Sequence, residues 1–100
     1  MKPRRVEFSE AARRDLSELY DWIAAAAGPA VADRYLDRLA AWCRGFDLAS
    51  ERGTLRDDIR PGLRIVGFER RITIALMVEE DRVVILRLYY GGRDWPSDLG

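Results

Sequence analysis

The chain has 100 residues, of which 48% are hydrophobic, and its 17 basic residues are balanced by 17 acidic ones. A chain of this length is expected to form one domain, residues 1–100, that buries roughly two thirds of its unfolded surface. Because nucleic-acid binding favours a basic excess, the balanced charge argues against direct sequence-specific binding to DNA or RNA by this chain alone.

Cysteine and histidine usage excludes several kinds of site. Cys43 is the only cysteine, and histidine is absent. A single chain therefore offers no disulfide, no Cys/His zinc site and no histidine-based proton relay. The carboxylates are scattered, so we expect no metal and no cofactor. No signal peptide and no apolar run of ~20 residues is present, which favours a cytoplasmic protein without a membrane span.

The first part of the chain predicts a short strand and a helix. Residues 4–8 alternate in polarity as a strand does, and Ser9 is a good N-cap for a helix that begins at the next residue. From Glu10 to about Ala27, apolar residues recur at helical spacing, which predicts an amphipathic helix. The apolar stripe consists of Ala12, Leu16, Leu19, Tyr20, Ile23 and Ala27. The other faces are filled by Arg13, Arg14, Asp15, Glu18 and Asp21.

Gly28 and Pro29 end this helix and begin a second one, because proline fits well in a first helical turn. So short a turn requires an antiparallel helical hairpin. The second apolar stripe consists of Val31, Tyr35, Leu39, Trp42, Cys43 and Phe46. Trp22, Trp42 and Tyr35 are interpreted as core residues, and Cys43 as a buried, inert thiol.

The second half predicts a loop and a meander of strands. Residues 49–62 contain few apolar side chains and several glycine or proline residues, which is typical of a surface loop. Three β-rich runs come next, at residues 63–68, 72–78 and 83–90. Their short connections make them antiparallel. The predicted fold is α+β, in the order β-α-α-β-β-β, with a helical hairpin packed on a four-stranded, mainly antiparallel sheet.

The most distinctive motif is ILRLYYGGRDW at residues 85–95, where an apolar strand pattern breaks into a Gly-Gly turn. It resembles the C-terminus of the ParE branch of the ParE/RelE toxin family, which reads roughly ILRVLHGARDW. Tyr90 replaces the usual histidine and Gly92 the usual alanine. The opening VEFSEAARRDLSELYDWIA and the stretch PGLRIVGFERRITIALMVEEDRVV are also similar to ParE sequences, so the resemblance covers the whole chain.

This resemblance implies a small toxin of a bacterial toxin–antitoxin pair. RelE-type members cut mRNA on the ribosome and ParE-type members act against DNA gyrase, so the shared fold alone does not choose between them. RNA cleavage needs groups that accept and donate protons, together with cations that stabilise charge. The strand-borne candidates for these roles are Arg64, Glu69, Arg71, Arg87, Tyr89 and Tyr90.

That set can bind phosphate but contains no obvious proton relay, apart from a tyrosine acid paired with a glutamate base. We therefore expect a non-enzymatic gyrase inhibitor, neutralised by a ParD-like antitoxin. The alternatives are a RelE-type ribosome-dependent mRNA endonuclease and a non-toxic interaction module of the same fold.

The resemblance also implies two binding surfaces. The target surface would consist of Arg87, Tyr90, Arg93, Asp94 and Trp95. The antitoxin would use the helical hairpin, the exposed sheet edge and the nearby loop, by helix docking or strand addition. Structural roles remain open beside these functional ones. Arg87 can pair with an acidic residue, Trp95 can pack on the domain, and one of Tyr89 and Tyr90 can pack while the other is exposed.

Overall fold

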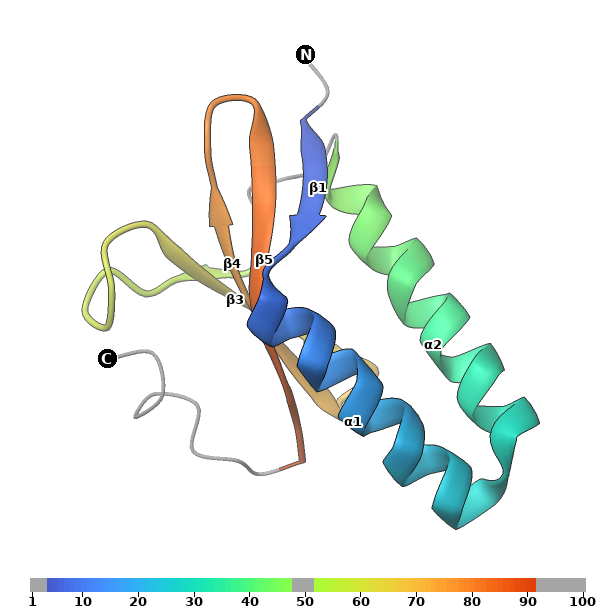
Figure 1. The fold of residues 1–100 in the computed structure, drawn as a ribbon. Coiled ribbons are helices and arrows are strands. Elements are labelled where there is room, and N and C mark those ends of the chain that lie inside the picture. Colours follow the sequence, from blue (N-terminus) through green and yellow to red (C-terminus); the bar gives the residue numbers. More distant parts are fainter. Residues whose placement is uncertain (1–3, 48–51, 92–100) are drawn as a thin grey trace.

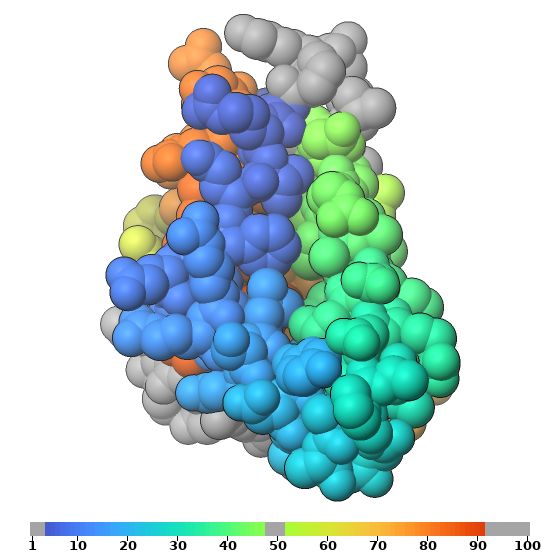
Figure 2. All heavy atoms as spheres, turned by 45° about the vertical axis from the view of Figure 1, so that its right-hand side comes forward, coloured from blue at the N-terminus to red at the C-terminus, as the bar shows by residue number. Residues whose placement is uncertain are grey.

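The computed structural model describes residues 4–47 and 52–91, and it confirms the α+β class. Two helices, α1 (Glu10–Ala27) and α2 (Pro29–Arg44), form an antiparallel hairpin on one side of a sheet (Figure 1). Figure 2 shows the two helices, in blue and in green, side by side over this face of the molecule. The 3-10 turn Gly45–Asp47 continues α2.

The sheet has five strands in the spatial order β1-β5-β4-β3-β2. The strands are β1 (Arg5–Phe8), β2 (Thr54–Leu55), β3 (Leu63–Phe68), β4 (Ile72–Val78) and β5 (Arg82–Tyr90). β1 runs parallel to β5, and all other pairs are antiparallel. The sheet is thus mainly antiparallel, as predicted.

The predicted strand count of four is wrong by one, because β2 lies within the segment expected to be a surface loop. β2 pairs with β3 through only two residues, Thr54 with Ile65 and Leu55 with Arg64. Gly53 precedes it at a positive φ of 75°, and a Cβ at this position would collide with the Ile65 carbonyl. The backbone of this short edge strand therefore requires glycine at residue 53.

The predicted helix boundaries are confirmed by the caps. The Ser9 hydroxyl accepts a hydrogen bond from the Ala12 amide at 3.0 Å, which satisfies one of the free N–H groups of the first turn of α1. Gly28 has φ of 98° and connects the two helices, and Pro29 occupies the first turn of α2. The tight connection follows from these residues.

The main core lies between the helices and the sheet. Tyr35, Leu39 and Cys43 of α2 are buried there, as predicted, and Trp42 is half-buried. Two predictions are wrong, because Val31 is exposed and the chain buries Ala32 instead, while Trp22 is 53% exposed. A smaller apolar cluster on the other sheet face contains Leu63, Ala75 and Tyr89. Within residues 4–47 and 52–91, no helix has the length and apolar character of a membrane span.

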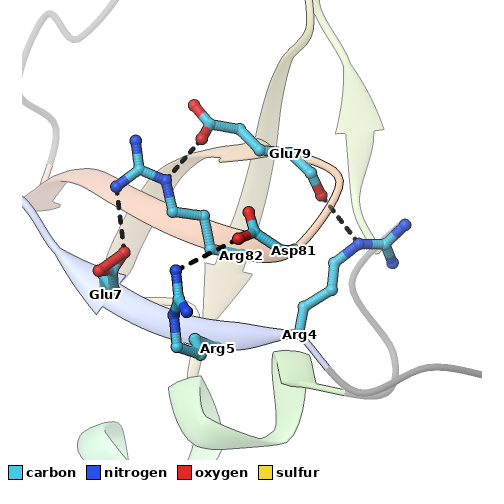
Figure 3. A network of polar contacts seen from close by, with 6 residues as sticks. All are labelled: Arg4, Arg5, Glu7, Glu79, Asp81 and Arg82. Atoms are coloured by element: carbon cyan, nitrogen blue, oxygen red, sulfur yellow. Dashed lines mark hydrogen bonds and ion pairs between the residues drawn. The ribbon is translucent and has the colours of Figure 1, made fainter.

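A network of charged side chains fixes β1 beside the β4–β5 hairpin (Figure 3). Arg82 binds the carboxylates of both Glu7 and Glu79, and Arg5 pairs with Asp81 at 3.3 Å. Arg4 donates to the Glu79 carbonyl at 2.9 Å. Because exposed ion pairs contribute little singly, this network acts chiefly by fixing the parallel register of β1 on β5.

The buried thiol gives a pH-dependent prediction. Burial raises the pKa of Cys43 to about 12, so the folded state holds the proton that an unfolded chain loses near pH 9. The free energy of unfolding should therefore fall as the pH rises above about 9, by about 1.4 kcal/mol per unit, until the folded thiol itself ionises near 12. Urea unfolding at pH 8 and 10.5 measures this loss.

The control is Cys43→Ala, which should lose about 2 kcal/mol less between these two pH values. Burial also raises the pKa of Tyr35, but that phenol is present in both proteins and cancels in the comparison. Equal losses in the parent and in Cys43→Ala would contradict the assignment.

Candidate functional site

The second half of β5 has an open edge. β1 pairs only with Arg82–Ile85, after which the chain turns into α1 at Ser9 (Figure 1). The backbone amide of Ser9 donates to the carbonyl of Ile85 at 2.9 Å, and the side-chain hydroxyl of Ser9 donates to the carbonyl of Leu86 at 2.7 Å. From Leu86 onward, the edge of β5 that faces away from β4 therefore lies beside α1 instead of beside another strand.

The register of the sheet defines which main-chain groups lie on this open edge. The Gly91 amide donates a hydrogen bond to the Arg71 carbonyl of the β3–β4 turn. Along an antiparallel ladder, residues that exchange hydrogen bonds with the neighbouring strand alternate with residues that do not. This alternation directs the N–H and C=O groups of Leu88 and Tyr90 away from β4. We refer to Leu86–Tyr90 as the open edge of β5.

Asp15 of α1 satisfies part of the open edge. Its carboxylate accepts hydrogen bonds from Nε and Nη2 of Arg87, at 2.8 and 3.1 Å, and from the Leu88 amide at 2.9 Å. Its side chain is only 5% exposed. Three donor groups, two of them on the Arg87 cation, offset the cost of burying this charge. The interpretation of Asp15 as a solvent-facing residue is therefore wrong.

A β-bulge precedes Arg87 and sets the phase of β5 beside this carboxylate. Ala75 pairs with Arg87 but the next residue, Leu76, pairs with Ile85, so β5 contains one extra residue. Because of this extra residue, Leu88 points toward the helices as Ile85 does, and both side chains reach the helix-facing core. Without it, simple alternation from Ile85 would turn Leu88 out of the core.

The structural role considered for Arg87, pairing with an acidic residue, is confirmed. Its ion pair with Asp15 is structural, yet 28% of its side chain remains exposed at the surface. Its guanidinium also lies 5.0 Å from the centre of the Tyr89 ring. The arginine is thus held in one orientation by a carboxylate and an aromatic ring.

A groove of about 320 Å³ lies between α1 and the end of β5. Trp22, half exposed, forms one wall and tilts against Tyr90 with ring centres 4.5 Å apart. The groove is lined by Asp15, Glu18, Leu19, Trp22, Ile72, Leu88, Tyr89 and Tyr90. The sequence pattern did not identify Trp22 and Glu18 as site residues, because their role depends on the open strand edge beside them.

Arg87 and Tyr90 both lie in the second half of β5, but Arg87 contacts Tyr89 of the smaller cluster while Tyr90 packs on the main core. The two tyrosines point to opposite faces, and the prediction that one packs and the other is exposed holds in part, because Tyr90 is only partly buried. Tyr89 is buried in the smaller cluster, while Tyr90 packs against the main core. The other predicted target residues, Arg93, Asp94 and Trp95, lie outside the described residues.

The candidate acid–base groups do not all lie together: Glu69, Arg71 and Tyr90 are near enough to Tyr35 to influence its pKa, whereas Arg64 is distant from them. Glu69, in the β3–β4 turn, accepts two hydrogen bonds from Arg38 at 3.1 and 3.2 Å, and this arginine lowers the pKa of Glu69. Arg64 lies at the other end of β3 and donates to the Arg52 carbonyl. Among the described residues, no group of three or more cysteine or acidic side chains is arranged to hold a metal ion.

Comparison with known proteins agrees with this architecture. A chain of the chromosomal ParDE toxin–antitoxin system from P. aeruginosa matches with a TM-score of 0.76 and 22% identity, over 87% of this chain and 95% of that chain. A chain of the RelBE2 toxin–antitoxin complex from Mycobacterium tuberculosis matches with a TM-score of 0.65 and 20% identity, over 93% of this chain and 97% of that one. No curated protein is significantly similar in sequence.

At these identities the solved structures establish the fold alone, and the family rests on sequence. The model of the family described as the ParE toxin of the type II toxin–antitoxin system, parDE, matches residues 6–95. This match includes both helices, the sheet apart from the first residue of β1, and the first residues after β5. The chain therefore belongs to the ParE toxins of type II toxin–antitoxin systems.

Proposed function

We propose that this toxin acts in the cytoplasm by binding DNA gyrase through the end of β5 and the segment after it. Family membership supports the proposal. The observation that carries it is the presentation of Arg87, which is fixed by Asp15 and Tyr89 yet remains partly exposed beside an open strand edge. A charged group that is already oriented before binding loses little conformational entropy when a partner arrives.

The states of Glu69, Tyr89 and the arginines support binding over RNA cleavage. Glu69 is engaged by Arg38, which favours its charged form and makes it a weaker base. Tyr89 is buried, so its phenol is not placed to protonate a leaving group. Arginine holds its proton at physiological pH and cannot serve as a proton shuttle.

We further propose that a ParD-like antitoxin neutralises the toxin by occupying the groove between α1 and β5. Both structural neighbours come from toxin–antitoxin systems, which supports an antitoxin partner. The groove offers an apolar surface for a helix, and Tyr90 offers main-chain groups for an added strand. Because Asp15 and Tyr89 contact Arg87 and also line the groove, an occupant would interfere with target binding.

A truncation tests the gyrase proposal. Removing the residues after Gly92 should weaken inhibition of gyrase supercoiling by more than about 30-fold, the effect of losing an interface hot spot of about 2 kcal/mol. Antitoxin binding should change little, since the groove is lined by residues before Gly91. Supercoiling assays, antitoxin titration and thermal melts of the same samples provide the three measurements.

Three outcomes would contradict this assignment. Full inhibition by the folded, truncated chain would exclude the terminal segment and direct attention to the predicted loop at residues 49–62. Ribosome-dependent mRNA cleavage by the parent protein, without gyrase inhibition, would favour the RelE-type activity. A lower melting temperature of the truncated chain, together with loss of both binding activities, would indicate that the segment stabilises the domain. This result would also contradict a purely target-binding role.

A further inference from the structure

The groove between α1 and β5 has an unusual chemical lining for an apolar site. Three of its eight lining residues are aromatic, and two are carboxylates. The rings belong to Trp22, Tyr89 and Tyr90, while Asp15 and Glu18 supply the carboxylates. Aromatic faces combined with acidic groups form a site that favours a cation.

The two carboxylates differ in their availability. Asp15 is neutralised by the guanidinium of Arg87 and also accepts the Leu88 amide. Glu18 is exposed on the next turn of α1 and has no ion-pair partner within residues 4–47 and 52–91. No cationic side chain is among the described residues that line the groove. Glu18 is therefore the group in this lining that can pair with an incoming positive charge.

The volume and shape limit what can enter. A site of about 320 Å³ is at the small end of ligand pockets, which suits one long side chain better than a large molecule. Leu19, Ile72 and Leu88 provide an apolar floor for an aliphatic stem. The half-exposed Trp22 and the adjoining Tyr90 provide ring faces near the mouth of the groove.

We infer that this groove selects an arginine side chain of the antitoxin segment that docks there. The planar guanidinium can stack on Trp22 or Tyr90 and donate two hydrogen bonds to the Glu18 carboxylate, which an ammonium group cannot match. The open edge at Tyr90 provides main-chain groups for the peptide that carries the arginine. This inference rests on the proposed antitoxin docking, and it specifies the chemistry of that site.

The experiment compares argininamide with citrullinamide, its neutral analogue of similar shape. Both are titrated into the full-length toxin while the indole N–H of Trp22 is followed by NMR, with that signal assigned by its loss in Trp22→Phe. Argininamide should produce a saturable shift, and citrullinamide should bind at least about 5-fold more weakly. Glu18→Gln should reduce the preference for argininamide, whereas the matched change Glu10→Gln, in the first turn of α1 and away from the groove, should not.

Several results would overturn the inference. Equal responses to the two amides would show that charge is not recognised, and absence of any response would show that the groove does not accept this group. Stronger binding of lysinamide would assign the site to an ammonium group. A Trp22 shift that depends on protein concentration alone would identify a second copy of the chain as the occupant.

A second arm separates this inference from the proposed function. Glu18→Gln should weaken binding of the cognate antitoxin while gyrase inhibition by the free toxin remains at the parent level. If argininamide fails but the antitoxin still competes with gyrase, the proposed function stands and only the arginine preference is wrong. If gyrase inhibition is absent from the parent, the amide titrations still report on the groove.

Discussion

Leu39→Asp is expected to leave the chain mostly unfolded at 25 °C. Leu39 is completely buried in the middle of α2, between the helical hairpin and the sheet. Truncating a buried leucine costs about 3 to 5 kcal/mol, and an unpaired carboxylate in the same place adds its own desolvation cost. A domain of this size has a free energy of unfolding of only about 5 to 15 kcal/mol. Circular dichroism and urea unfolding measure the loss directly.

The matched control is Ala41→Asp, which introduces the same charge on the exposed face of the same helix. Its cost should be within about 1 kcal/mol, as is usual for surface positions. If Leu39→Asp is as stable as this control, the helix does not present Leu39 to the core in solution. The comparison thus tests the phase of α2 independently of any toxin activity.

Much of the fold was predictable because its signals are local. Ser9 caps α1 through a residue three positions away, and Gly28 with Pro29 defines the turn between the helices. The strands β3 and β4 were predicted with the bounds that they have in the structure. These elements are specified by neighbouring residues, so a linear pattern is enough to locate them.

The fifth strand and the exposed Trp22 were not predictable in this way. β2 consists of two residues whose strand conformation depends on pairing with β3, so its own sequence carries little signal. Trp22 reads as a core residue by composition, yet it lies at the groove because β1 ends before covering the second half of β5. Both features are set by the ends of other elements.

Asp15 was predicted to lie outside the apolar stripe of α1, and its spacing shows why that prediction was wrong. It lies three residues after Ala12 and four before Leu19, which places it on the buried stripe of α1. An acidic residue at such a position predicts a buried partner. The identity of that partner was not predictable. Arg87 is 72 residues away, and the β-bulge before it interrupts the simple alternation of side chains along β5.

Arg87→Met is expected to destabilise the folded state more than any exposed charge substitution in the chain. It would leave the Asp15 carboxylate, 5% exposed, with the Leu88 amide as its remaining partner of the three described. Breaking a buried pair in this way costs about 3 to 5 kcal/mol, and the partial exposure of Arg87 places the expected loss near the lower value. Urea unfolding of the purified variant measures it.

A double-mutant cycle shows whether the loss comes from the Asp15–Arg87 pair. Asp15→Leu combined with Arg87→Met removes both charges, so the double variant should be more stable than the sum of the single losses predicts, by about 2 kcal/mol. The control cycle uses Arg5 and Asp81, whose side chains are 68% and 60% exposed and whose coupling should lie between about 0 and 1 kcal/mol. Equal coupling in the two cycles would contradict a buried, oriented arginine. It would also remove the physical basis for presenting Arg87 to a target. A side chain that Asp15 does not hold in place would lose more conformational entropy on binding.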